Sequence, residues 1–326
     1  MLGPEALNDH LAELRDEVER ALANLVEQEM AGPAAEAMNL SRSILLAGGK
    51  RWRPVMTLLA HEAAGGTSND PVIDLALAFE LIHTATLVHD DLNDGARRRR
   101  GVPTLHTTHG DAHSIIAGDH LFVLGFGLGG RYDRPIVDAV SRTCAAIAAA
   151  ELQQLRHIGD LTTSPDDYYA IIEGKTAGPF QTACWSAATV AGADPVIAEA
   201  LRGFGLEVGL AFQIVDDLLD LTGDDEMGKP RGTDVYEGKM TLPLIHALTM
   251  LHGEARLRLA EILGAFHDGC WDELTTLLQT AGSFRYTRQL VENHLGRALD
   301  HLSGLPDTPA REMMLDLSSG SVGRRM

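Results

Sequence analysis

Two acidic motifs, each at the end of an apolar, helix-forming segment, constrain this chain more than any other feature. Each motif contains three aspartates: Asp90, Asp91 and Asp94 in LVHDDLND, and Asp216, Asp217 and Asp220 in FQIVDDLLD. Residues four apart lie above one another on a helix, so the first and last aspartates of each motif lie close together. Because like charges at this spacing destabilise a helix, the pattern predicts two helices that each need a compensating cation.

Magnesium is the cation that these motifs favour. In proteins Mg²⁺ is bound through one or two carboxylates and completes its octahedron with water and substrate phosphate oxygens. A single DDxxD motif could equally be a solvated helix end. Two copies, each preceded by an apolar segment, favour a metal-dependent phosphate site over that alternative.

Basic, glycine-containing segments surround the acidic motifs. They are GGKRWRP (residues 48–54), RRRRGVPT (97–104), GKTAG (174–178) and GKPRGTDVYEGKMTLP (228–243). The chain as a whole is acidic, with 27 Lys and Arg against 46 Asp and Glu and a formal charge of -19, which disfavours nucleic-acid binding. An anionic substrate must therefore be bound locally, and Lys or Arg beside a carboxylate-bound divalent ion is a suitable diphosphate site.

The motifs together resemble those of one enzyme family. GGKRWRP, ELIHTATLVHDDLNDGARRRRGVPT, AGDHL, EGKTAG, GLAFQIVDDLLDLTGD and EGKMTLPLI follow its order and about its spacing. From about Leu11 to about Arg325 the chain resembles the trans-isoprenyl diphosphate synthases, also called the polyprenyl synthetase family. The resemblance implies an all-α fold, a large helical bundle of the isoprenoid synthase type with a central active-site cavity, and a homodimer.

The domain organisation can also be examined without the resemblance. A chain of 326 residues suggests two domains on length alone. However, no Pro-, Gly- or Ser-rich linker or change of composition divides it, so we expect one domain over residues 1–326. Alternating β-branched segments bounded by hairpin turns are missing from the sequence, which favours an all-α class.

The helix-forming segments follow from apolar spacing and from Gly and Pro positions. We expect helices at 7–30, between Pro33 and Gly48, and at about 54–64, 71–92, 112–128, 134–158, 166–190, 195–222, 241–252, 256–266, 270–280, 283–303 and 308–318. Two long polar segments, 93–110 and 223–239, each follow an acidic motif. Long loops of this kind are typical of active-site lids.

The location of the protein is predicted from its cysteines and apolar segments. The three cysteines are widely spaced and form no CxxC pair, which suits a reducing cytoplasm better than a disulfide framework or a zinc site. The N-terminal sequence lacks the pattern of a signal peptide. The most apolar stretch, residues 115–130, is too short to cross a bilayer, so we expect no integral membrane segment.

The resemblance also implies a role for each motif residue. The metal ligands are Asp90, Asp94, Asp216 and Asp220, which bind Mg²⁺ bridging the allylic diphosphate. The allylic-diphosphate residues are Arg99, Lys175, Thr176, Gln213, Lys229 and Lys239, and the isopentenyl diphosphate residues are Lys50, Arg53, His83 and Arg100. The catalytic set is Asp90, Asp94, Lys175, Gln213, Asp216 and Lys239. Asp91 and Asp217 are expected to orient water and neighbouring groups, and His83 could alternatively be a core histidine.

The implied reaction is ionisation, condensation and elimination. Loss of diphosphate from the allylic substrate gives a carbocation, the double bond of isopentenyl diphosphate attacks it, and the released diphosphate removes a proton. No side-chain nucleophile is needed, which agrees with a sequence that offers no Ser-His-Asp or Cys-His arrangement. A helix break around Lys175 and Thr176 is expected to present carbonyl groups to the cation.

The length of the product depends in this family on residues four and five positions before the first aspartate. Here they are Thr86 and Ala85, and neither is bulky enough to block a growing chain. We therefore expect geranylgeranyl diphosphate or a longer product. The alternatives are a class I terpene cyclase, which normally carries a different second metal motif, and a noncatalytic partner subunit, in which one acidic motif is expected to be lost.

Overall fold

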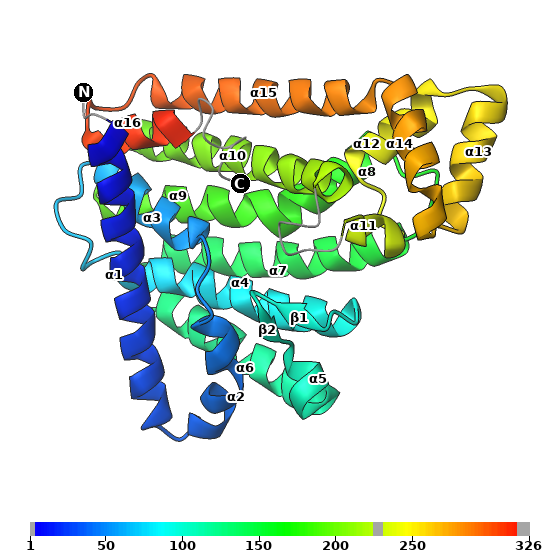
Figure 1. Ribbon diagram of the computed structural model, residues 1–326. Coiled ribbons are helices and arrows are strands. Elements are labelled where there is room, and N and C mark those ends of the chain that lie inside the picture. Colours follow the sequence, from blue (N-terminus) through cyan, green and yellow to red (C-terminus); the bar gives the residue numbers. More distant parts are fainter. Residues whose placement is uncertain (1–3, 224–230, 318–326) are drawn as a thin grey trace. The chain divides into compact units, whose positions relative to one another are not determined.

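The computed structural model describes residues 4–223 and 231–317 and consists almost entirely of helices (Figure 1). The α-helices are α1 (Pro4–Met30), α2 (Ala35–Leu45), α3 (Trp52–Ala63), α4 (Ile73–Asn93), α5 (Leu105–His109), α6 (Asp111–Gly129), α7 (Arg134–Arg156), α8 (Pro165–Ile172), α9 (Gly178–Val190), α10 (Pro195–Thr222), α11 (Thr233–Tyr236), α12 (Leu242–Met250), α13 (Gly253–Gly264), α14 (Trp271–Thr280), α15 (Ser283–Leu302) and α16 (Pro309–Asp316). A π-helix covers Glu173–Ala177, a 3₁₀-helix covers Asp268–Cys270, and two strands, β1 (Arg98–Arg99) and β2 (Val102–Pro103), form a hairpin. The predicted all-α class is confirmed, and the central cavity stays a prediction.

Two segments contain features that the predicted helix ranges alone do not describe. The predicted helix at 166–190 is interrupted by the π-helix, at the position where a break around Lys175 and Thr176 was expected, so that α8 and α9 are separate elements. The predicted loop at 93–110 contains the β1–β2 hairpin and the short helix α5. Of the second predicted loop, residues 224–230 lie outside the described residues, and α11 occupies part of the remainder.

The chain folds into two compact units, each made of segments that are distant in the sequence. Unit 1 comprises 1–144, 179–202 and 302–315, and unit 2 comprises 145–178, 203–301 and 316–326. The first acidic motif belongs to unit 1 and the second to unit 2. Whether the chain is one functional domain stays a prediction.

In unit 1, α4 packs closely against α6 because α6 presents glycines to it. A Cβ added at Gly118 would lie 2.2 Å from Nε2 of His89, and one added at Gly125 would lie 2.9 Å from the Ala78 carbonyl oxygen. Larger side chains at these positions would separate the helices. The close packing fixes the helix that ends in the first acidic motif.

In unit 2, α10 is held in a similar way against the π-helix. A Cβ added at Gly209 would lie only 2.5 Å from the Cα of Ala177. Around this contact, Ile214 and Ala211 of α10 pack in one apolar cluster with Tyr168 of α8. The second acidic motif therefore lies near the C-terminal end of a helix whose buried face is tightly packed.

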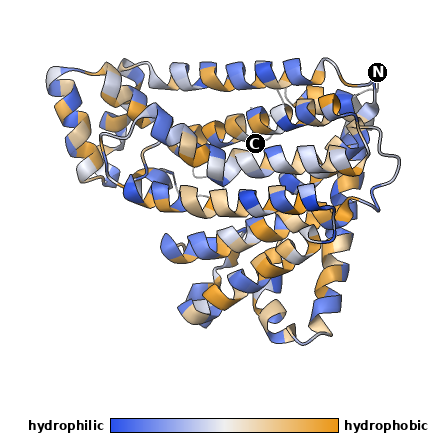
Figure 2. Cartoon of the chain, turned by 180° about the vertical axis from the view of Figure 1, so that it is seen from behind, coloured by the Kyte–Doolittle hydropathy of each residue, from blue (hydrophilic) through white to orange (hydrophobic). Residues whose placement is uncertain are grey.

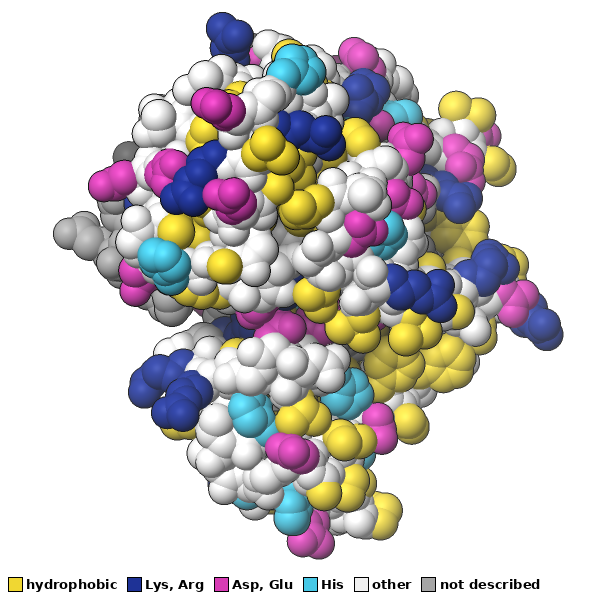
Figure 3. Space-filling model, turned by 90° about the vertical axis from the view of Figure 1, so that its right-hand side faces the viewer, with side chains coloured by type: hydrophobic (Ala, Val, Ile, Leu, Met, Phe, Trp, Pro, Cys, Tyr) yellow, Lys and Arg dark blue, Asp and Glu magenta, His cyan; other side chains and the backbone are white. Residues whose placement is uncertain are grey.

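The charged side chains are distributed over the surface and do not form one large basic area on the face drawn in Figure 3. On the face drawn in Figure 3, Lys and Arg side chains occur in small separate groups among acidic and apolar ones. Apolar and polar residues interleave along the helices in Figure 2. Among the helices that the structure describes, none has both the length and the apolar character needed to cross a membrane. The three cysteines are free and buried.

Candidate active site

The first acidic motif stands at the C-terminal end of α4. Asp90 is half-buried, and Asp94 is exposed at the position that caps the helix. Asp91 points inward and is only 1% exposed, and its Oδ1 accepts hydrogen bonds from Nε and Nη2 of Arg99 at 2.8 and 2.7 Å. Burial raises the pKa of Asp91, against the lowering effect of the Arg99 guanidinium. Asp90 and Asp94 therefore differ from Asp91 in their access to solvent.

Arg99 belongs to the short β1–β2 hairpin that follows this motif. Arg100 and Gly101 form its two-residue turn, with φ of 50° and 78°. Positive φ at both positions is typical of the type I′ turn, where glycine or asparagine is usual and arginine is not. The Arg100 guanidinium is bound at Nη2 by Oε1 of Glu80 at 3.1 Å and at Nη1 by the Ile44 carbonyl oxygen at 3.3 Å.

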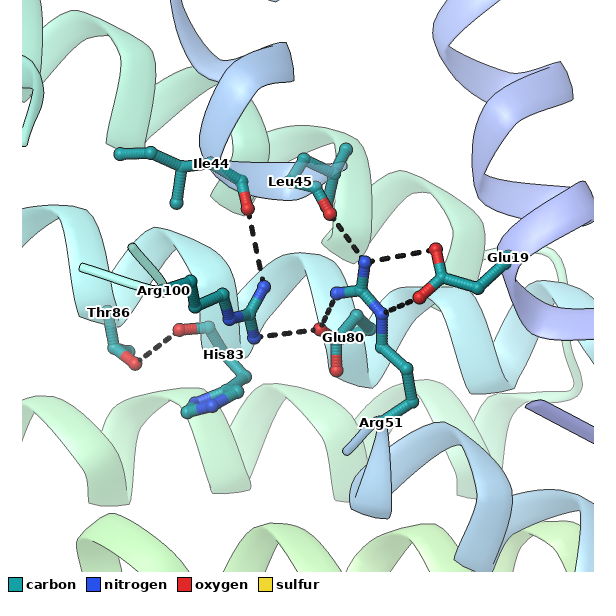
Figure 4. A network of polar contacts seen from close by, with 8 residues as sticks. All are labelled: Glu19, Ile44, Leu45, Arg51, Glu80, His83, Thr86 and Arg100. Atoms are coloured by element: carbon teal, nitrogen blue, oxygen red, sulfur yellow. Dashed lines mark hydrogen bonds and ion pairs between the residues drawn. The ribbon is translucent and has the colours of Figure 1, made fainter. Parts of the chain in front are cut away.

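The segment GGKRWRP forms a second loop beside this turn and leads into α3. Gly48 and Gly49 have positive φ, and so has Arg51, with φ of 50°. The Arg51 guanidinium is buried and binds Glu80 through Nη1 at 2.5 Å and Glu19 through Nε at 2.7 Å (Figure 4). Each non-glycine residue in this conformation costs about 1–2 kcal/mol, so these contacts have to hold the loop in place.

His83 lies on α4 between these basic groups. Burial lowers its pKa well below the ordinary value, and the charges of four arginines, Arg53, Arg100, Arg99 and Arg51, lower it further. His83 is therefore a neutral hydrogen-bonding group within a strongly cationic region. The Arg53 guanidinium lies 5.0 Å from the centroid of the Phe180 ring, and burial lowers its pKa to about 10, which leaves it charged at neutral pH.

Three of the four predicted isopentenyl diphosphate residues lie in this cationic region of unit 1: Arg53, His83 and Arg100. Arg53 and Arg100 act electrostatically on His83, and Lys50 is exposed one residue before Arg51. Arg99 lies in the same region, although it was assigned to the allylic substrate, and its guanidinium is paired with Asp91. An anion that enters this region meets several guanidinium groups at once, which suits a diphosphate.

The second acidic motif has the same division between inward and outward aspartates. Asp216 is exposed and Asp220 is half-buried, whereas Asp217 is 4% exposed. The Tyr168 hydroxyl donates to Oδ2 of Asp217 at 2.6 Å, and Nε2 of Gln213 donates to Oδ1 at 2.8 Å. Burial raises the pKa of Asp217, and nearby negative charge adds to this effect.

The π-helix connects the basic residues of unit 2 to this motif. The Thr176 hydroxyl donates to Oε1 of Gln213 at 2.8 Å, which links the π-helix to Asp217 through one side chain. Nζ of Lys175 lies 2.6 Å from Oε2 of Glu151 and 3.0 Å from Oε1 of Gln154 on α7. A π-helix inside an α-helix is frequent at functional sites.

The remaining predicted allylic residues lie near the C-terminal end of α10 or outside the described residues. The amide of Asp234 donates to Oδ2 of Asp220 at 3.2 Å, and the amide of Lys239 donates to the Asp234 carbonyl oxygen at 2.8 Å. Nζ of Lys239 lies 2.5 Å from Oε2 of Glu237. Lys229 lies outside the described residues.

The donor sets fit a magnesium ion that is shared with a substrate. In residues 4–223 and 231–317, no three His, Cys, Asp or Glu side chains are grouped so that they could hold a metal ion alone. Each motif instead offers two carboxylates at i and i+4, the number that Mg²⁺ takes when phosphate oxygens and water complete its octahedron.

The two predicted chain-length residues lie one turn before the first motif. Ala85 is fully buried, and its helical position is on the same face of α4 as Ile82 and His89, which pack on glycines of α6. Thr86 is half-buried, and its hydroxyl donates to the His83 carbonyl oxygen at 2.8 Å.

Sequence reasoning missed three residues that organise the site: Arg51, Glu80 and Tyr168. Glu80 is the one acidic residue in the apolar segment LALAFELIHTATLVH, and an acidic residue in such a position signals a buried ion pair. Tyr168 and Arg51 gave no comparable signal, because their partners are distant in the sequence.

Comparison with known proteins decides the family. The model of the family described as polyprenyl synthetase matches residues 35–280. The chain belongs to this family. It is 36% identical to an all-trans-nonaprenyl-diphosphate synthase (geranyl-diphosphate specific) of Rhodobacter capsulatus, with 93% of this chain and 94% of the relative covered. It is 32% identical to a geranylgeranyl diphosphate synthase of Methanosarcina mazei, over 89% and 90% of the two chains.

Comparison with a solved structure shows that the similarity to polyprenyl synthetases includes the fold. A polyprenyl synthase from Caulobacter crescentus CB15, complexed with calcium and isoprenyl diphosphate, matches with a TM-score of 0.89 and 35% identity. The match covers 98% of each chain. The resemblance predicted from the sequence motifs is therefore confirmed at the level of the family.

Proposed function

We infer that the chain is a trans-polyprenyl diphosphate synthase, a prenyltransferase that joins isopentenyl diphosphate head-to-tail to an allylic diphosphate. Membership of the polyprenyl synthetase family supports this activity. The observation that carries the assignment for this chain is the pair of acidic motifs, each with two aspartates that are at least partly exposed and one that is held inward.

The metal in this proposal is Mg²⁺. In unit 1 the carboxylates that would bind it are Asp90 and Asp94, and in unit 2 they are Asp216 and Asp220. The complex of the Caulobacter relative with calcium and isoprenyl diphosphate supports the use of a divalent ion. When bound, the metal neutralises charge that develops on the departing diphosphate.

The protein's own residues then have separate tasks. Arg53, His83 and Arg100, with Lys50, bind the diphosphate of isopentenyl diphosphate in the cationic region of unit 1. In unit 2 the allylic diphosphate is bound by Lys175, Thr176, Gln213 and Lys239. The family resemblance assigns Arg99 and Lys229 to the same substrate. The Thr176–Gln213–Asp217 hydrogen bonds support the second set by fixing the π-helix against α10.

We propose a product of geranylgeranyl length or longer. The support is the small side chain of Ala85 on the buried face of α4, since a bulky residue would block a growing apolar chain there. The relatives named above make products of different lengths, so membership of the family does not select among them.

We also propose that the protein acts as a homodimer in the cytoplasm. Helix α6 carries apolar residues on more than one side, although Asp119 and His120 interrupt them. One side packs on α4, whereas Ile115, Ile116, Val123 and Phe126 form an exposed stripe on the other. A second copy that covers this stripe with its own would be consistent with a symmetric interface.

One experiment tests the activity against its alternatives. Purified protein is incubated with Mg²⁺, labelled isopentenyl diphosphate and a panel of allylic primers, and the chain length of the products is measured. A prenyl synthase extends the primer by five-carbon units. A terpene cyclase would release a hydrocarbon or alcohol without incorporating the label, and a noncatalytic subunit would form no product, so either result would contradict the proposal.

A further inference from the structure

The two basic loops of unit 1 meet at one buried carboxylate. Arg51 and Arg100 are the non-glycine residues with positive φ in the described parts of the chain, and both have φ of 50°. Nη1 of Arg51 and Nη2 of Arg100 both bind Oε1 of Glu80, at 2.5 and 3.1 Å (Figure 4). Glu80 is 1% exposed and comes from the middle of α4.

The loops also contact each other directly. A Cβ added at Gly49 would lie 3.5 Å from Nε of Arg100, so the side chain of one loop lies across the backbone of the other. Each guanidinium further binds a carbonyl oxygen at the end of α2: Arg51 binds that of Leu45 at 2.7 Å, and Arg100 that of Ile44 at 3.3 Å. Both loops are thus fixed to the same helix end and the same glutamate.

The charges explain why this glutamate is needed. Four guanidinium groups act on His83, so they also repel one another, and each loop has a backbone conformation that an arginine rarely adopts. A buried carboxylate that binds two guanidinium groups offsets the repulsion and favours the strained conformation. Glu19 cannot replace it, because Glu19 reaches Arg51 alone and is one-third exposed.

We propose that Glu80 is a positioning residue for the diphosphate of isopentenyl diphosphate. It does not bind the substrate; it holds the two loops that carry Lys50, Arg53 and Arg100 in the conformation that does. This inference rests on the proposed function for the identity of the substrate. The claim that Glu80 organises an anion site does not depend on catalysis.

The test is Glu80→Gln, with Glu62→Gln as the matched control. Glutamine preserves size and one acceptor oxygen but removes the charge. Glu62 also lies on a helix of unit 1 and is partly buried, but it binds His10 at 2.8 Å and no arginine. We expect Glu80→Gln to raise the Michaelis constant for isopentenyl diphosphate by about tenfold or more, with that for the allylic substrate changed by less than about threefold, and Glu62→Gln to change neither.

A merely structural role gives a different result. If Glu80 only supports the fold, Glu80→Gln lowers the melting temperature but changes both Michaelis constants equally or not at all, and the inference is wrong. Should Glu80→Gln not fold, Glu80→Asp retains the buried charge but is too short to reach both arginines. It must raise the constant for isopentenyl diphosphate selectively, and an unchanged value overturns the inference.

A binding measurement separates this inference from the proposed function. Inorganic pyrophosphate is titrated calorimetrically into the parent protein and Glu80→Gln without divalent metal, so that the acidic motifs cannot bind it through a cation. Weaker binding by Glu80→Gln supports the positioning role even if the parent fails to condense the two substrates, a failure that would contradict the proposed function alone. Equal affinities overturn the inference.

Discussion

Removing the hydroxyl of Tyr168 tests whether the inward aspartate of the second motif must be held in place for catalysis. Tyr168 is 4% exposed, and its hydroxyl donates to Asp217 at 2.6 Å. In Tyr168→Phe the buried Oδ2 of Asp217 loses this donor, while Gln213 still binds Oδ1. Leaving a buried acceptor unsatisfied costs about 1–3 kcal/mol.

This cost sets the expected change in rate. If Asp217 moves to recover a partner, the neighbouring Asp216 and Asp220 and the Gln213–Thr176 hydrogen bond move with it, because they share α10 and the π-helix. Since each ~1.4 kcal/mol of lost transition-state stabilisation lowers a rate about tenfold, kcat should fall by a factor between about 5 and about 150. The assay is steady-state condensation, with thermal unfolding measured in parallel.

The adjacent tyrosine provides the matched control. Tyr169 is half-buried, and its hydroxyl lies 3.1 Å from Nε2 of His294 on α15. Tyr169→Phe makes the same chemical change one residue along α8. We expect it to lower the melting temperature slightly and to leave kcat within about twofold of the parent. Equal losses of kcat in the two variants, or full activity in Tyr168→Phe, would refute the reasoning.

Three further predictions concern the metal, the substrates and the product. Asp90→Ala and Asp216→Ala should each lower kcat by orders of magnitude with the circular dichroism spectrum unchanged. Chelation of divalent ions should abolish the activity of the parent. Full activity in either variant would show that its motif does not bind the metal. Lys50→Ala should mainly raise the Michaelis constant for isopentenyl diphosphate, whereas Lys175→Ala should mainly affect the allylic substrate, and indistinguishable kinetics would show that the division of the substrates is wrong. Ala85→Phe should shift products towards farnesyl diphosphate in a chain-length analysis, because a ring on this buried face of α4 fills space that the growing chain needs; an unchanged product distribution would mean that the chain grows elsewhere.

Regular helices were the part of this fold that the sequence predicted best. The predicted segments 71–92, 134–158 and 195–222 correspond to α4, α7 and α10 within a few residues. Apolar residues at three- and four-residue spacing carry that information locally. Asp91 and Asp217 were also expected to have a different role from the other aspartates, as residues that orient neighbouring groups, and both are buried.

The partners of these inward residues were not predictable, because they come from other elements. Arg99 binds Asp91 from a hairpin whose strands are two residues long, too short to leave an alternating pattern. Glu80 binds Arg51 across 29 positions of the chain, and Tyr168 binds Asp217 across 49. The residue pattern within one segment does not identify such a partner. The single charge of Glu80 in an apolar segment indicates only that it has a partner somewhere in the chain, because buried charges are paired.

The π-helix at Glu173–Ala177 makes the number of residues in this segment important as well as their identity. A π-helix closes i→i+5 hydrogen bonds, so one of its turns holds one residue more than a turn of α-helix, in which each residue turns by about 100°. Ala177 is fixed against α10 at Gly209, and Tyr168 must face Asp217 on the same helix. Regular α-helix over the same number of residues would therefore turn the Tyr168 hydroxyl away from its carboxylate by about the angle of one residue, although every side chain that binds Asp217 would still be present in the sequence.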